Sequence, residues 1–139
     1  MRVLQVASEA TPFAKTGGLA DVAGALPEAL AHQGCDVTLV IPAYREVFSK
    51  GLPIEPTGLA FDVPLGTRQL PARIFRCVLP GSRVETLLVA NDECFDRPSL
   101  YGGAEDYTDN SERFIFFSRA TMSVTAGEMP SVLCPIFRA

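Results

Sequence analysis

The sequence has no tryptophan and a single histidine, His32, among its 139 residues. This composition argues against a histidine-based metal site or a Ser-His-Asp triad formed by this chain alone. The four cysteines, Cys35, Cys77, Cys94 and Cys134, are widely spaced and form no CxxC pair. This spacing favours free thiols in a reducing cytoplasm over disulfides or a zinc site.

Long apolar runs and a large excess of one charge are also missing. No run approaches the ~20 residues needed to cross a bilayer, and the apolar part of residues 1–10 is too short for a secretory signal. The 12 basic and 16 acidic residues give a net charge of −4. That balance argues against a general nucleic-acid-binding or anionic-membrane surface. We therefore expect no nucleic acid and no membrane as partners, and a cytoplasmic location.

What the chain does have is the composition of one folded domain, with 47% hydrophobic and 20% charged residues. The runs RVLQVA (2–7) and CDVTLVIP (35–42) are typical of buried parallel strands. Between them, apolar residues spaced by three and four predict one face of a helix: Leu19, Val22, Ala23, Leu26, Ala29 and Leu30. We expect Pro27 to kink this helix without ending it, and Gly34 to terminate it.

The strand–helix–strand order predicts a right-handed, parallel βαβ unit. Three strand-like runs then follow, divided by turns rich in proline and glycine: 58–64, 69–81 and 83–91. They predict an antiparallel excursion within or beside the main sheet, with the apolar stretch at 84–90 as another central strand. The expected fold class is α/β, with a Rossmann-like, doubly wound, mostly parallel sheet.

After these strands, a polar loop leads to a second long helix. Asp109 or Asn110 is expected to cap it, with Phe114, Phe117 and Met122 roughly on one side. No clear periodicity is found beyond residue 124.

The most informative segment is KTGGLAD, Lys15 to Asp21, between the first strand and the first helix. Adjacent glycines cost backbone entropy, so the bare backbone predicts a close approach by another group. Ligands of open α/β sheets bind at the carboxyl ends of the strands, where this loop lies. The N–H groups of Gly17 and Gly18, the helix N-terminus and Lys15 would attract an anion, while Asp21 can accept hydrogen bonds from hydroxyls. The segment predicts an anion-binding loop that suits a phosphate and a sugar together.

Plainer interpretations stay open on spacing alone. A glycine pair before a helix is often a tight turn, in which case Lys15 is a solvated surface lysine. Asp21 by itself is more often a favourable charge in the first turn of a helix than a ligand-binding group. The segment also matches neither GxxxxGK[ST] nor GxGxxG. Spacing therefore supports function and simple turn about equally.

The residues themselves are more specific than their spacing. VLQVASEATPFAKTGGLADVAGALPEAL resembles the N-terminal signature of bacterial glycogen synthases and plant starch synthases. VTLVIPAYR, FDRPSLYG and YTDNSERFIFFSRA follow in the family's order and at similar positions, so the resemblance covers residues 1–120. It implies the N-terminal half of a GT-B glycosyltransferase, which has two Rossmann-like domains and an active site between them. Such enzymes move glucose from ADP-glucose to the non-reducing end of an α-1,4-glucan, such as glycogen, with retention of configuration.

The resemblance also implies roles for individual residues. Lys15 would bind the nucleotide sugar, Gly17 and Gly18 would approach its diphosphate, and Asp21 would lie near the glucose. Tyr101 matches a tyrosine that lines the donor cleft, and a loop anchor is its equal alternative. No catalytic residue is assigned. Cations and helix entries of this kind stabilise the charge that grows on departing ADP, so no metal or other cofactor is expected.

The chain departs from the family pattern after about Ala120. The family continues with a histidine-aspartate-tryptophan segment, whereas this chain ends TMSVTAGEMPSVLCPIFRA. We therefore expect an incomplete N-terminal catalytic domain at 1–120, a divergent or truncated tail at 121–139, and no C-terminal nucleotide-binding domain. Such a chain would be inactive alone. The alternatives are a non-catalytic remnant, and a half-enzyme that needs a separate C-terminal domain.

Overall fold

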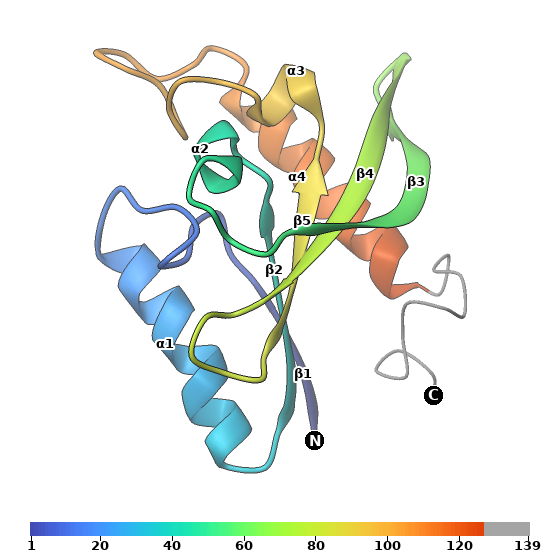
Figure 1. Ribbon diagram of the computed structural model, residues 1–139. Coiled ribbons are helices and arrows are strands. Elements are labelled where there is room, and N and C mark those ends of the chain that lie inside the picture. The colour runs from blue at the N-terminus through green and yellow to red at the C-terminus, as the bar shows by residue number, and fades with distance from the viewer. Residues whose placement is uncertain (127–139) are drawn as a thin grey trace.

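The computed structural model describes residues 1–126, which fold around a five-stranded sheet with the spatial order β1-β2-β5-β4-β3 (Figure 1). The strands are Arg2–Val6 (β1), Asp36–Pro42 (β2), Glu55–Leu65 (β3), Arg68–Val78 (β4) and Glu85–Ala90 (β5). The helices are Gly18–His32 (α1), Arg45–Phe48 (α2), Asp92–Phe95 (α3) and Asn110–Thr125 (α4). The predicted α/β class is confirmed. The tail from residue 127 onward, with Cys134, lies outside the described residues.

The sheet is mixed in the described part of the chain. β1 pairs with β2, and β2 with β5, in parallel, so the predicted βαβ unit is confirmed. β4 runs antiparallel to both β5 and β3, which confirms the antiparallel excursion. Gly66 turns the β3–β4 hairpin with φ of 62°, a left-handed conformation that favours glycine. β5 lies in the middle of the sheet, as its apolar sequence predicted.

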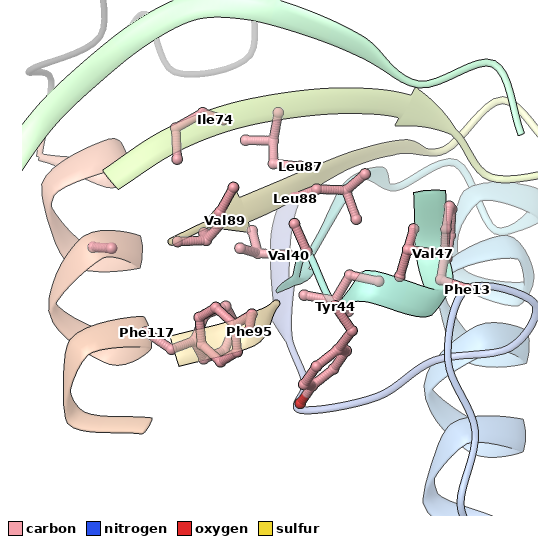
Figure 2. Close-up of a cluster of buried hydrophobic side chains, with 14 of the residues drawn as sticks. Phe13, Val40, Tyr44, Val47, Ile74, Leu87, Leu88, Val89, Phe95 and Phe117 are labelled. Carbon is pink, nitrogen blue, oxygen red and sulfur yellow. The ribbon is translucent and has the colours of Figure 1, made fainter. Parts of the chain in front are cut away.

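Helices α1 and α4 lie on opposite sides of the sheet (Figure 1). Covering both faces explains why β2 and β5 are almost continuously apolar and buried. Phe95 and Phe117, from α3 and α4, meet edge to face with ring centroids 6.4 Å apart, in the core that Figure 2 shows. β1, in contrast, was expected to be buried and is not. No described strand pairs with its outer edge, and Val6 is 45% exposed.

Helix α1 buries only part of the face that its periodicity indicated. The buried residues are Ala20, Ala23 and Pro27. The larger residues of the predicted face point outward, with Leu19 53%, Val22 63% and Leu26 43% exposed. Small side chains at the contact allow a closer approach of the helix to its neighbours, which accounts for the face that is buried.

Pro27 does not end α1, and a side chain from β1 takes the place of its missing donor. Pro27 has no N–H, so the carbonyl oxygen of Ala23 loses its usual partner four residues later. The Nε2 atom of Gln5 donates a hydrogen bond to that oxygen at 2.8 Å. The helix then continues to His32, and Gly34 follows its C-cap with φ of 86°, as predicted.

Helix α4 begins where its sequence indicated, although its first residues act differently. Asp109 occupies the N-cap position without making a side-chain capping bond. Its carboxylate instead accepts hydrogen bonds from Arg97 at 2.8 and 2.6 Å. Phe117 is buried as expected, whereas Met122 is 68% exposed and does not belong to the packed side.

Two further expectations concern membrane-spanning helices and the cysteines. Among residues 1–126, no helix is both long enough and apolar enough to cross a membrane. Cys35, Cys77 and Cys94 are free thiols, and burial raises the pKa of the Cys94 thiol to about 11. Such a thiol stays protonated at neutral pH and is a poor nucleophile.

Candidate functional site

The β1–α1 loop, residues 7–17, leaves the sheet at the carboxyl end of β1 and leads directly into α1 (Figure 1). Its middle is firmly packed. The N–H groups of Phe13 and Ala14 both donate to the carbonyl oxygen of Ala10, and all three residues are fully buried. The loop therefore presents the KTGG segment from a rigid base, at the end of the sheet where open α/β folds bind ligands.

A buried carboxylate fixes the start of the KTGG segment. Glu9 is 4% exposed, and it accepts hydrogen bonds from the Thr16 backbone N–H at 2.5 Å and from the Thr16 hydroxyl at 2.9 Å. These bonds hold the residue that immediately precedes Gly17. Neither Glu9 nor Thr16 was expected as a site residue from the sequence. The available signal was a Ser-Glu pair directly after a parallel strand, at the ligand-binding end of the sheet.

The structure brings Lys15 and Asp21 into direct contact. Lys15 Nζ lies 2.8 Å from Oδ1 and 2.7 Å from Oδ2 of Asp21, and Thr11 also donates to Oδ1 at 3.2 Å. The hydrogen bond from Lys15 holds the pKa of the Asp21 carboxyl below its usual value. Both side chains are about half exposed, at 52% and 55%. An ion pair this exposed is weak, so a diphosphate can compete with Asp21 for the lysine.

The two glycines are not required by the fold of the described chain. Gly17 is extended, with φ of −158°, and Gly18 is the first residue of α1. Neither has a positive φ, and a Cβ added to either would meet no heavy atom within 4 Å. No part of the described chain therefore lies close to these two glycines, and the backbone there is open to a group from outside. The helix N-terminus also has no side-chain cap, which leaves its N–H groups free for a ligand from outside.

Tyr101 lies at the base of the β1–α1 loop and makes the contacts of an anchor. Its hydroxyl is 2.8 Å from the Ser8 hydroxyl, and its ring packs at 5.8 Å from that of Phe114. Tyr44, which was not expected as a site residue, donates to the Ser8 carbonyl oxygen at 2.6 Å. Burial raises the pKa of the Tyr101 hydroxyl, so the group stays a neutral donor and acceptor. Lys15 and Asp21 thus contact each other, while Tyr101 joins the same loop at its opposite end.

Comparison with known proteins identifies the family. The sequence profile described as "Starch synthase catalytic domain" matches residues 2–134. The glycogen synthase of Rhodopirellula baltica is 40% identical over 132 residues, covering 88% of this chain and 26% of that protein. Glycogen synthase 2 of Geobacter metallireducens is 45% identical over 123 residues, with coverages of 88% and 25%. The glycogen synthase of Syntrophotalea carbinolica is 41% identical over 136 residues, with coverages of 96% and 28%.

A solved structure shows the same fold. The catalytic domain of starch synthase IV from Arabidopsis thaliana, bound to ADP and acarbose, superposes with a TM-score of 0.76 at 24% identity. The match covers 91% of this chain and 26% of that one. The chain thus spans about a quarter of the length of the curated relatives it matches, between 25% and 28% for these three. On the profile match over residues 2–134, the chain belongs to the starch synthase catalytic domain family.

Proposed function

We propose that the β1–α1 loop binds the nucleotide-sugar donor of an ADP-glucose-dependent α-1,4-glucan glucosyltransferase, a glycogen or starch synthase. The observation on which this rests is the open space at Gly17 and Gly18, beside Lys15 and an uncapped helix N-terminus. Anions bind well at such N-termini because free N–H groups and the helix dipole both face them. The relatives named as glycogen synthases support this activity, and the related starch synthase structure holds ADP and acarbose.

In this proposal each residue of the loop has a separate task. Lys15 exchanges its contact with Asp21 for one with the diphosphate, whose oxygens also accept from the N–H groups near Gly17 and Gly18. Asp21, released from the lysine, accepts a hydrogen bond from a glucose hydroxyl. As the glycosidic bond breaks, negative charge grows on ADP, and these donors stabilise it. No residue of this chain is assigned to the chemical step at the sugar, and no metal is assigned a role.

The loop is proposed to work as part of a larger catalytic unit, with ADP-glucose and glycogen as substrates and the cytoplasm as its location. Leu19, Val22 and Leu26 form an exposed apolar face on α1, and no described strand pairs with the outer edge of β1. Apolar faces and free strand edges of this kind are usually covered in a complete protein. They favour a longer polypeptide or a half-enzyme with a separate C-terminal domain over a self-sufficient module.

The test is Lys15→Gln, made in a full-length chimera. In this chimera, residues 1–126 replace the matching segment of the Geobacter metallireducens relative. Loss of one charge-assisted contact to the diphosphate should lower kcat/KM for ADP-glucose by about 5- to 150-fold, equivalent to about 1–3 kcal/mol. Lys50→Gln is the matched control, because the Lys50 ammonium group contacts Pro12 and Glu46 in the described chain and no residue of the KTGG segment. Parent-like donor kinetics in the Lys15 variant would refute the assignment.

A second prediction separates donor binding from folding at the glycine pair. Gly18→Val adds side-chain atoms where the folded chain has open space, so the melting temperature should stay within a few degrees of the parent. The same atoms would obstruct a diphosphate at the helix N-terminus, so the KM for ADP-glucose should rise at least about tenfold. If the melting temperature and the KM both match the parent, the glycine pair is only a permissive turn.

A further inference from the structure

Arg113, near the start of α4, is the largest fully buried side chain of the described residues, at 1% exposure. No carboxylate of residues 1–126 forms an ion pair with it. The guanidinium instead lies over aromatic rings, with its central carbon 5.0 Å from the Tyr107 ring centroid and 5.5 Å from that of Phe95. Burial is the main cause of a lowered pKa for this group. Burying a charge without a partner charge is costly, so packing alone does not explain an arginine here.

The guanidinium donates to three acceptors spread along the segment between α3 and α4. Nε donates to the carbonyl oxygen of Cys94 at 2.6 Å. Nη1 donates to the carbonyl oxygen of Leu100 at 2.8 Å and to Oδ1 of Asn110 at 2.7 Å. Because the fork is planar and rigid, these bonds fix the relative positions of three points in the chain.

Two of these three points are attached to Tyr101. Leu100 is the preceding residue, and Nδ2 of Asn110 donates to the Tyr101 carbonyl oxygen at 2.8 Å. The Tyr101 hydroxyl is 2.8 Å from that of Ser8, a residue 93 positions away in sequence. Ser8 is followed by Glu9, which holds Thr16 through its carboxylate. A continuous set of contacts therefore runs from α4 to the residue before Gly17.

We propose that Arg113 is a positioning residue for the donor-binding loop. Through Leu100 and Asn110 it sets the place of Tyr101, and Tyr101 sets the place of Ser8 at the base of the β1–α1 loop. This inference rests on the proposed function of that loop. It explains why a buried arginine is used where an apolar side chain of similar volume would pack at lower desolvation cost.

The test is a double-mutant cycle in the full-length chimera, with Arg113→Lys, Tyr101→Phe and the combined variant. Lysine keeps the charge but cannot reproduce the planar fork, and phenylalanine removes only the hydroxyl that contacts Ser8. Each single change should raise the KM for ADP-glucose by about five- to tenfold while the KM for glycogen stays unchanged, the effect of losing one or two hydrogen bonds. If Arg113 acts through Tyr101, the combined variant should be little worse than the more affected single variant.

The control is Arg119→Lys, on the same helix. Arg119 is exposed and donates to the carbonyl oxygen of Pro64 at 2.6 Å, on the β3 side of the helix. This variant should behave like the parent. If Arg113→Lys folds poorly, Asn110→Leu interrupts the same connection at a half-buried residue, and the cycle with Tyr101→Phe is repeated with it.

The outcomes separate the inference from the proposed function. The inference would be overturned if the increases in donor KM from the two single changes multiply in the double variant. It would also be overturned if the KM for ADP-glucose and the KM for glycogen rise equally. Either result would show that Arg113 has a general structural role. A parent-like donor KM in Arg113→Lys would likewise overturn the inference when Lys15→Gln in the same chimera does raise it. A parent-like donor KM in Lys15→Gln would instead overturn the proposed function, whatever the Arg113 variants do.

Discussion

A purified polypeptide of these 139 residues is expected to transfer no measurable glucose from ADP-glucose to glycogen. Lys15 and Asp21 are 52% and 55% exposed, so the loop can contact its ligand from one side only. Fixing donor and acceptor between two walls is worth ~7–11 kcal/mol of the reaction barrier. A diphosphate held by one wall also faces water, where its attraction to lysine is weak. Binding by a single loop should have a dissociation constant in the millimolar range at best, which is a binding free energy of about −4 kcal/mol.

The measurement follows ADP release and the incorporation of labelled glucose into glycogen. The full-length chimera serves as the positive control, since it presents the same loop within a complete catalytic unit. Turnover by the 139 residues close to that of the chimera would contradict the prediction. Activity that appears only when a separate C-terminal domain is added would identify a half-enzyme. No activity under either condition would identify a remnant.

The second large effect is expected at Gly24, in the middle of α1, where an added methyl group should destabilise the fold. A Cβ at Gly24 would collide with the backbone carbonyl of Thr11 and lie 3.2 Å from the Thr11 nitrogen. Backbone cannot rotate away as a side chain can, so Gly24→Ala must separate the helix from the β1–α1 loop. We expect a loss of about 2–4 kcal/mol in the free energy of unfolding, at or beyond the upper end of overpacking costs.

Urea unfolding of the Gly24→Ala and Gly18→Ala variants compares their free energies of unfolding with that of the parent. Helix propensity alone predicts that alanine stabilises a mid-helix position by about 1 kcal/mol relative to glycine, the opposite sign. A methyl group at Gly18 would meet no heavy atom within 4 Å, so that variant should unfold at the parent's urea concentration. A Gly24→Ala protein as stable as the parent would show that the loop does not pack against α1 as described.

The order and type of the strands and of the two long helices followed from sequence, whereas the short helices α2 and α3 and the buried face of α1 did not. Strands that are covered on both faces have nearly continuous apolar sequences, and turns are rich in glycine and proline. These two signals predicted β2, β5 and the hairpin correctly. Helix α1 is apolar on more than one side, with alanines between its leucines. Periodicity favoured the side with larger residues, including Leu26. Ala23 is buried as predicted, but Ala20 shares the contact in place of the larger residues, where Gly24 meets the Thr11 backbone.

For the candidate site, the sequence by itself determined the chemistry of the KTGG loop, because a cation, bare backbone and a helix start are local properties of adjacent residues. Only the tertiary structure decided that Lys15 pairs with Asp21, that Glu9 holds Thr16, and that Tyr101 reaches Ser8. The last of these contacts joins residues 93 positions apart. Such a contact depends on how β1 and the segment before α4 meet in space, and no local pattern encodes the distance between two side chains that the fold brings together.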